Sequence, residues 1–196
     1  MSEVLSKYRG LFSDIRKLVA KSKREVLRGA PSGLIATNVN FFTKSYLIMI
    51  CVYLEAYIKE IAQQYIAYCN DRLGAADIPR NLVLWSIKPS EKIKPALSKF
   101  EPYGLSISKE SLDNLVSANP FRTKEMFMHL GIDLDNKKAI KQRYELVGQI
   151  VRKRNDIIHY NDTASDVSLD DVLNYISLFR YYMKAVDDVV CACMLK

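Results

Sequence analysis

The chain has 196 residues, of which 49% are hydrophobic and 26% are charged, and its formal net charge at pH 7 is +7. A chain of this length and composition can bury a core of its own, which excludes a disordered protein and favours one domain over residues 1–196. Only seven Gly and six Pro are present. Long uninterrupted segments are therefore expected, and an all-α fold is favoured over a sandwich or barrel of many short strands.

Cysteine and histidine positions give no sign of a metal centre. The cysteines lie at 51, 69, 191 and 193 and the histidines at 129 and 159, spacings that match neither a disulfide framework nor a zinc site. We expect no metal and no cofactor. The most apolar run, residues 45–54, is shorter than the roughly 20 residues of a membrane span, and the first residues do not resemble a signal peptide. A soluble, cytoplasmic protein with no membrane partner is expected.

Two long helices are predicted in the first part of the chain. Apolar residues recur every three or four positions over 3–29, which predicts an amphipathic helix that ends at Gly29-Ala30-Pro31. A second helix is predicted over 38–73, ending at Gly74. Its first half is apolar nearly all round, so this half is expected at the centre of the bundle.

Residues 75–122 contain five of the six prolines and are predicted to form an insertion of short helices packed on the bundle. The clearest of these covers about 108–118. Thr123 is predicted to cap a further short helix that runs to Leu130 and is closed by Gly131.

The last part of the chain is predicted to hold two long helices. One covers about 136–159, and a turn-rich loop follows at 161–166. Ser168-Leu-Asp-Asp171 has the form of a capping box, with Asp in place of Glu, and opens a final helix that reaches about Met194.

Positive charge is concentrated before residue 155. Residues 137–154 contain seven Lys or Arg and one Glu, whereas residues 155–196 contain seven Asp. Such a run suits an anionic partner, but a solvated helix face has the same composition.

Arg154 and His159 stand out as a pair because they offer an acid/base and an anion stabiliser near one helix end. Imidazole titrates near neutral pH, and guanidinium can bind two phosphate oxygens at once. This combination suits RNA cleavage without a metal, because the nucleophile is the 2'-hydroxyl of the substrate. The alternative is structural, since the helix dipole favours a histidine near a C-terminus in any protein.

Residues five apart in a regular helix point about 140° away from each other. Arg154 and His159 can therefore act on one substrate only if the helix frays there or if a second subunit completes the site.

The stretch Leu146-Val-Gly-Gln-Ile-Val-Arg-Lys-Arg-Asn-Asp-Ile-Ile-His159 resembles the signature of HEPN domains, an Arg-x(4–6)-His motif with a polar residue after the arginine. Phe127-Met-His-Leu-Gly-Ile132, Tyr53-Leu-Glu-Ala-Tyr-Ile-Lys-Glu60 and the Ser-Leu-Asp-Asp helix start resemble the RiboL-PSP branch. The resemblance implies an antiparallel helical bundle, a homodimer with its two motifs face to face, and often RNA cleavage in toxin-antitoxin or antiviral defence systems. Some HEPN domains bind without cutting.

By this resemblance, His159 is the expected general base or acid and Arg154 the expected stabiliser of the pentavalent phosphate, with Asn155 orienting one of them. General acid/base cleavage needs two proton-handling groups, and each chain offers one motif histidine. A twofold dimer supplies the second.

The neighbours of the motif are secondary candidates. Arg152, Lys153 and Tyr160 are expected to hold phosphates or stack a base, unless they are a solvated face and a packing tyrosine. Glu55 directly follows the apolar run and is expected either to pair with Arg154 or Lys59, as a group behind the site, or to lie at the surface edge of its helix.

The sequence thus favours a metal-independent endoribonuclease that acts on RNA as a homodimer, with an antitoxin or another defence-system protein as a partner. The alternative is a non-catalytic HEPN module that binds RNA or a partner protein. A structural dimer domain is the third hypothesis.

Overall fold

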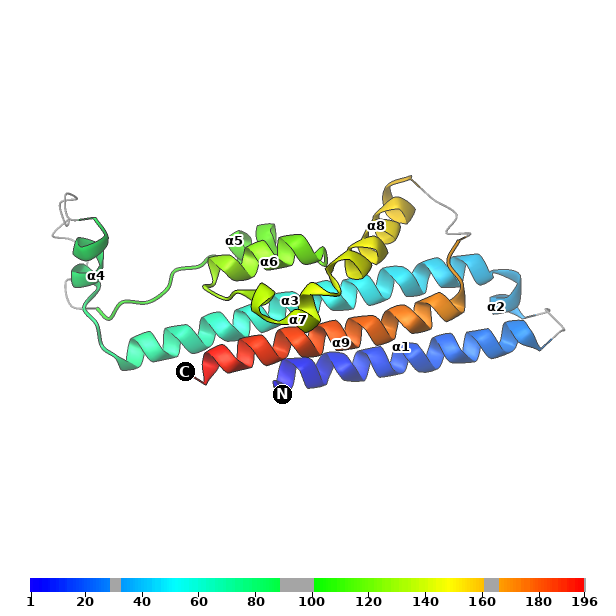
Figure 1. Ribbon diagram of the computed structural model, residues 1–196, viewed down its shortest axis with the longest axis horizontal. Coiled ribbons are helices and arrows are strands. Elements are labelled where there is room, and N and C mark those ends of the chain that lie inside the picture. The colour runs from blue at the N-terminus through cyan, green and yellow to red at the C-terminus, as the bar shows by residue number, and fades with distance from the viewer. Residues whose placement is uncertain (29–32, 89–100, 161–165, 196) are drawn as a thin grey trace.

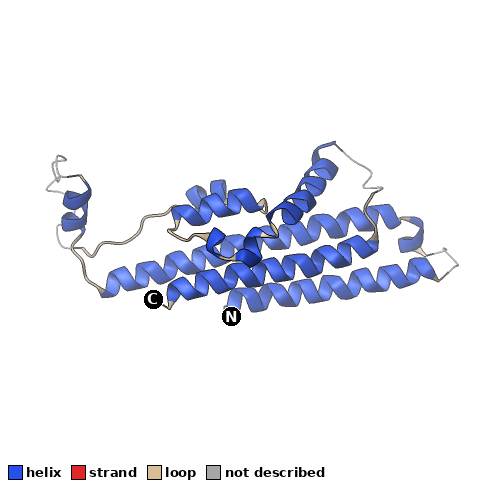
Figure 2. Cartoon of the chain, viewed as in Figure 1, coloured by secondary structure: helices blue, strands red, loops and turns tan. Residues whose placement is uncertain are grey.

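The computed structural model describes residues 1–28, 33–88, 101–160 and 166–195. The regular elements of this part of the chain are all helices, joined by loops, and it contains no β-strand, as Figure 2 shows. An isolated β-bridge joins Pro79 and Pro102. The expected all-α class is confirmed.

Three long helices lie side by side and form the body of the molecule (Figure 1). They are α1 (Glu3–Leu27), α3 (Val39–Ala75) and α9 (Leu169–Met194), and a single turn, α2 (Leu34–Thr37), precedes α3. The colour gradient of Figure 1 shows that α1 runs antiparallel to α3 and α9. The three long helices match the predicted ones to within a few residues, although the predicted end of the first helix, residues 29–31, lies outside the described residues.

The start of α9 is fixed by the predicted capping box. Ser168 Oγ accepts a hydrogen bond from the Asp171 backbone N–H at 3.0 Å, and the Asp171 carboxylate accepts one from the Ser168 backbone N–H at 2.9 Å. Two backbone donors that the first turn would leave unpaired are thereby satisfied. The pKa of Asp171 is lowered because the Ser168 side chain and backbone donate to it.

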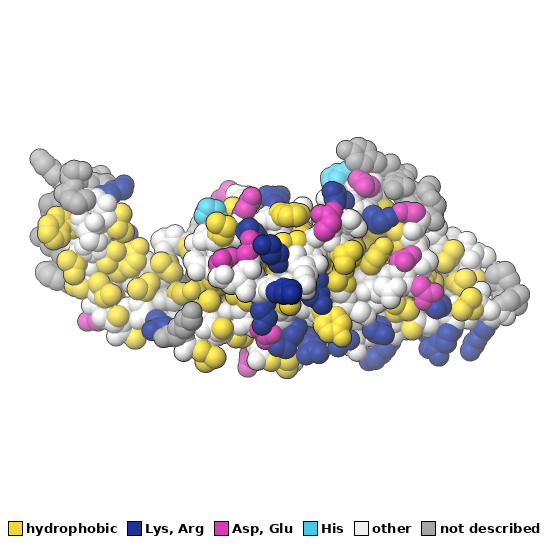
Figure 3. Space-filling view, in the orientation of Figure 1, with side chains coloured by type: hydrophobic (Ala, Val, Ile, Leu, Met, Phe, Trp, Pro, Cys, Tyr) yellow, Lys and Arg dark blue, Asp and Glu magenta, His cyan; other side chains and the backbone are white. Residues whose placement is uncertain are grey.

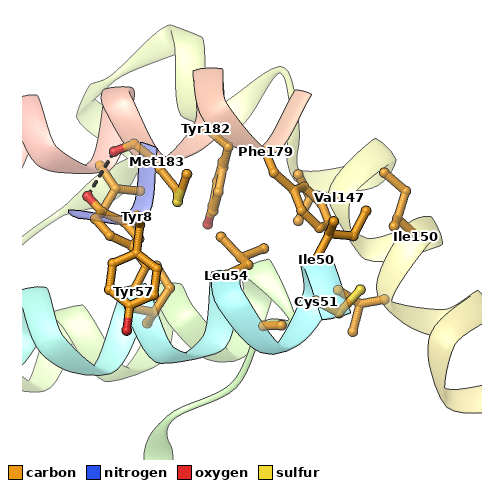
Figure 4. Close-up of a cluster of buried hydrophobic side chains, with 14 of the residues drawn as sticks. Tyr8, Ile50, Cys51, Leu54, Tyr57, Val147, Ile150, Phe179, Tyr182 and Met183 are labelled. Atoms are coloured by element: carbon orange, nitrogen blue, oxygen red, sulfur yellow. Dashed lines mark hydrogen bonds between the residues drawn. The ribbon is translucent and has the colours of Figure 1, made fainter. Parts of the chain in front are cut away.

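The core lies between the middle of α3 and the facing sides of α1 and α9. The buried side chains of α3 run from Leu47 to Ala62, and the Tyr57 hydroxyl donates to the Met183 carbonyl of α9 at 2.9 Å (Figure 4). Phe41, in the first half of α3, is 65% exposed. Leu47, Ile50 and Leu54 of the same half are fully buried. The expectation that the first half would be central therefore holds for its later turns and not for its first turn, and the buried stretch continues to Ala62.

By length and composition alone, α3 is apolar enough to cross a membrane. Here it packs against α1, α8 and α9, and the side chains that it buries face these helices. This is the position of the central helix in a bundle.

The insertion contributes α4 (Arg80–Ile87) and α5 (Lys109–Leu115), and residues 89–100 between them lie outside the described residues. α5 lies beside the next helix, as expected for a segment packed on the body, whereas α4 stands away from the body at the far end of α3 (Figure 1). The predicted packing on the bundle thus holds for α5 alone.

α6 (Pro120–His129) begins three residues earlier than predicted. Its N-cap is Asn119, whose side chain accepts from the Phe121 N–H at 2.9 Å, and Pro120 occupies the first helical position, where a missing N–H costs nothing. Thr123, the predicted cap, lies inside the helix and donates to the Asn119 carbonyl. Gly131 closes the helix as predicted, with a φ of 75° that favours glycine.

The predicted helix over 136–159 is broken. A 3-10 turn (Leu134–Asn136) and α7 (Lys138–Lys141) precede α8 (Tyr144–Tyr160), with Gln142 and Arg143 at the break. α7 packs on α9, whereas α8 packs mainly on α3 and α6 and to a smaller extent on α9. The chain changes direction so that apolar residues on both sides of the break reach the core. The spacing of apolar residues along the sequence does not reveal this change, because it depends on tertiary packing.

The first half of α8 is the part most firmly anchored in the core, and Ile157 is the one buried side chain among the described residues of its second half. Val147 and Ile150 are buried, and Figure 4 shows Val147 beside Ile50 of α3 and Phe179 of α9. The C-terminal half rises away from the long helices (Figure 1). The end of α8, which carries the Arg-Asn-x-x-x-His motif, is therefore presented at the surface.

A fully buried carboxylate ties the start of α1 to α9. Asp187 accepts hydrogen bonds from the Ser2 backbone N–H, at 3.2 and 3.3 Å to its two oxygens, and from the Ser2 hydroxyl. The same hydroxyl accepts from the Leu5 N–H at 3.0 Å, and so it caps α1 as well. Buried charge is tolerated only with such partners.

We expect Asp187→Ala to lower the free energy of unfolding by about 2–4 kcal/mol, because it leaves buried donors unpaired and removes charge-assisted hydrogen bonds. Urea denaturation followed by circular dichroism measures this. Asp188→Ala is the matched control: Asp188 pairs with Lys184 at the surface, and its loss should cost less than about 1 kcal/mol. Equal losses for the two variants would contradict the assigned role of Asp187.

Candidate functional site

The motif residues lie in the last two turns of α8. The helix continues without a break through Tyr160, so the fraying that would let Arg154 and His159 point the same way does not occur. His159 is exposed, and Arg154 and Asn155 are half-buried. In a continuous helix Arg154 and His159 point about 140° apart.

Arg154 points into a pocket of about 300 Å³ between α3, α5 and α8. Val52, Glu55, Ala56, Lys59, Asp113, Val116 and Arg154 line this pocket. The Arg154 Nη1 donates to the Asn155 Oδ1 at 3.0 Å, while Nε is buried and has no hydrogen-bond partner among the described residues. A guanidinium with an unpaired buried donor is costly to the fold.

Asn155 connects the two sides of the motif. It lies four residues before His159, on the same ridge of the helix, about 40° round the axis from it. Because Asn155 accepts from Arg154, it draws the guanidinium toward the ridge of the histidine. Asn155 was expected to orient either Arg154 or His159. The hydrogen bond joins it to Arg154.

Glu55 lies in the Arg154 pocket, but it forms no ion pair with Arg154 or Lys59 within the described part of the chain. Lys59 pairs with Asp113 of α5 instead. Glu55 is half-buried. It therefore fits neither expectation, since it is not in an ion pair and is not fully at the surface of its helix. Glu55 and Arg154 line the same pocket, so a negative charge and a positive charge share it.

The Cys51 thiol lies close enough to Arg154 and Glu55 for both charges to affect its pKa. Burial raises the pKa of Cys51 to about 12, the positive charge of Arg154 opposes the rise, and the charge of Glu55 adds to it. Cys51 therefore stays protonated and is a packing residue, not a nucleophile.

The two basic neighbours of the motif are both engaged with acids. Arg152 donates to Glu145 at 2.8 Å, and Lys153 pairs with Asp166. The hydrogen bond from Lys153 holds the pKa of Asp166 below its ordinary value. The side chain of Tyr160, the third expected RNA contact, lies outside the described residues.

Sequence reasoning missed the far wall of the pocket. Asp113 and Val116 come from the insertion, about forty residues before Arg154 in the chain, and no local pattern relates the two segments. Lys59 lay in the stretch that resembled HEPN domains but was considered only as a partner for Glu55. Among the described residues, no group of three or more His, Cys, Asp or Glu side chains is placed to hold a metal ion.

Comparison with known proteins gives one positive finding. The family model described as RiboL-PSP-HEPN matches residues 11–192, a range that includes α3, α8 and most of α1 and α9. No curated protein and no solved structure matches the chain. The match covers most of the chain and agrees with the helical bundle, and the chain belongs to the RiboL-PSP-HEPN family.

Proposed function

We propose that the protein is a metal-independent endoribonuclease. The family membership supports an RNA-related role. The observation that carries the finer proposal is the arrangement at the end of α8, where an exposed histidine shares a ridge with an asparagine that holds an arginine whose Nε has no partner. These are the groups that RNA cleavage through the 2'-hydroxyl requires.

In the proposed reaction a base removes the proton of the 2'-hydroxyl, and this oxygen attacks the adjacent phosphorus. The bond from phosphorus to the 5'-oxygen breaks, and the 5'-oxygen takes a proton from an acid. His159 serves as one of these two proton-handling groups, and Arg154 binds the oxygens of the pentavalent phosphate. The products are a 2',3'-cyclic phosphate and a 5'-hydroxyl end.

The second proton-handling group is proposed to come from a second copy of the chain. His129 is at the end of α6 and outside the motif, so one subunit has a single motif histidine, and the unbroken helix turns it away from Arg154. Apolar side chains border this region: Ile158 is 45% exposed on α8, and Met49 and Val52 are 44% and 43% exposed on α3. A twofold contact over this surface would cover them and bring two motifs together.

The setting is part of the same proposal. A nuclease of this kind would act in the cytoplasm, in a toxin-antitoxin or antiviral defence system, and a partner protein would restrain it there. The alternative function, a non-catalytic module that binds RNA or a partner protein, differs from the leading one only in the chemistry of the motif, so cleavage assays separate the two.

We expect His159→Ala to reduce RNA cleavage by about a hundred- to ten-thousand-fold, the usual contribution of an acid/base group. Arg154→Ala should cause a comparable loss. Cleavage by the unaltered protein should persist in EDTA, should leave 2',3'-cyclic ends or their hydrolysis products, and should fail on RNA with 2'-O-methyl at the cut site. Gel electrophoresis with end-group analysis measures each result.

His129→Ala is the matched control, because His129 is also exposed and also lies in the last turn of a helix. It should cleave as the unaltered protein does. A His159→Ala variant of full activity, or an unaltered protein that leaves every tested RNA intact, would overturn the nuclease proposal and favour the non-catalytic module.

We further expect Arg154→Met to leave the free energy of unfolding unchanged or to raise it by up to about 1 kcal/mol, because an apolar side chain removes a half-buried charge with an unpaired donor. Functional residues commonly carry such a cost to stability. Urea denaturation measures it, and Ile157→Ala, which truncates a buried side chain of α8, is the destabilising reference at about 2–4 kcal/mol. A loss above about 2 kcal/mol in Arg154→Met would show that Arg154 holds the fold.

A further inference from the structure

A second concave site lies between α1 and α9, two helices that carry no part of the motif. It is a cavity of about 270 Å³, lined by Arg9, Arg16, Ser177, Arg180, Tyr181 and Lys184. Lys and Arg side chains gather over this part of the molecule, along the lower edge of Figure 3. Four of the six lining residues are cations, and none is an acid.

Helix geometry builds this concentration of charge. Arg9 and Arg16 are seven residues apart on α1 and so lie on one face, about 10 Å from each other along the axis. On α9, Ser177, Arg180 and Lys184 follow at spacings of three and four, which also places them on one face. Because the two helices are antiparallel neighbours, the two basic faces meet along one seam.

The guanidinium groups in this cavity are not neutralised by carboxylates. Arg16 donates to the Ser177 hydroxyl at 3.1 Å, and Arg9 contacts the Met1 sulfur at 3.6 Å. Arg180 has no hydrogen bond or ion pair within the described part of the chain. A basic concave surface of this kind focuses the electric field and attracts anions.

Unlike these three arginines, Lys184 and the two basic neighbours of the motif have acid partners. Lys184 pairs with Asp188, which lies outside the cavity lining. Beside the motif, Arg152 and Lys153 are both paired with acids. The three arginines of the seam thus have no acid partner among the described residues, whereas Arg152 and Lys153, the two basic neighbours of Arg154, each have one.

An aromatic ring completes the site. Tyr181 is 67% exposed at the cavity, and the Arg143 guanidinium lies 5.8 Å from the centre of its ring. A cation against one aromatic face is a stabilising contact that holds the ring in place. An exposed aromatic side chain beside guanidinium groups is the combination by which proteins grip single-stranded nucleic acid.

We propose that the seam between α1 and α9 binds the phosphate backbone of single-stranded RNA, outside the cleavage site. Arg9, Arg16 and Arg180 bind phosphate oxygens, for which the guanidinium fork is suited, and Tyr181 stacks on a base. The choice of RNA as the anion rests on the proposed function. The seam holds the substrate, while the motif at the end of α8 cuts it.

The test is equilibrium binding of a fluorescein-labelled single-stranded RNA of about 20 nucleotides, long enough for several contacts, with 2'-O-methyl at every position. This probe cannot be cut by the proposed mechanism, so its binding is independent of cleavage. The variant is Arg16→Gln with Arg180→Gln. Lys21→Gln with Arg24→Gln is the matched control, because it removes the same charge from exposed positions of α1 outside the cavity.

The seam variant should bind about tenfold or more weakly than the unaltered protein, and its slope of log Kobs against log salt should be smaller by about 1.4, the value for two lost phosphate contacts on a single strand. The control should bind within about twofold of the unaltered protein. Circular dichroism checks that both variants fold.

Equal weakening in the two variants would overturn the proposal, since it would show a general effect of net charge. Binding to vesicles of an anionic phospholipid, dependent on Arg16 and Arg180, with no binding to the RNA, would overturn it as well. If the protein binds the probe through the seam yet cuts no natural RNA, the seam stands and the nuclease proposal fails.

Discussion

The geometry of one continuous helix determines how this site can work. α8 runs unbroken through Tyr160, so Arg154 and His159 point about 140° apart, one into a pocket against α3 and the other to solvent. The hydrogen bond from Arg154 to Asn155 reduces this separation but does not remove it. A single subunit therefore presents the two groups on different sides, and chemistry that uses both on one phosphate needs a second subunit.

Packing explains why the motif is exposed at all. Val147 and Ile150 bind the first half of α8 to the core, and the second half leaves the bundle. Within the motif, Arg154 contacts the body through the pocket it shares with Glu55, and Ile157 is buried. The buried Nε has no hydrogen-bond partner among the described residues, which is a cost to the fold at this position.

The long helices could be predicted from the sequence because their signals are local. The apolar period of α1 and the Ser168 capping box lie within the elements they define. The break before α8 could not be predicted, since it accompanies a change in packing: α7 lies on α9, whereas α8 lies mainly on α3 and α6. The motif was found by its residues, whereas its pocket wall at Asp113 comes from a distant segment that no spacing identifies.

The availability of charged side chains was the least predictable feature, because whether a cation can bind an anionic ligand depends on the residues that surround it in space. The basic run before residue 155 suggested phosphate contacts at Arg152 and Lys153, yet acids engage both. Arg9, Arg16 and Arg180 were unremarkable in sequence, and the antiparallel pairing of α1 and α9 brings them to one cavity. In this account the protein holds RNA on one pair of helices and cuts it at the end of another.

The central claim, that one active site draws on both subunits, is tested most directly with heterodimers. Subunits with and without His159→Ala, carrying different affinity tags, are co-expressed, and the mixed dimer is purified and assayed for RNA cleavage. The account predicts well under a tenth of the activity of the unaltered dimer, because one of the two proton-handling groups is missing from the shared site. Retention of about half the activity, as expected for two complete and independent sites in a twofold dimer, would contradict it.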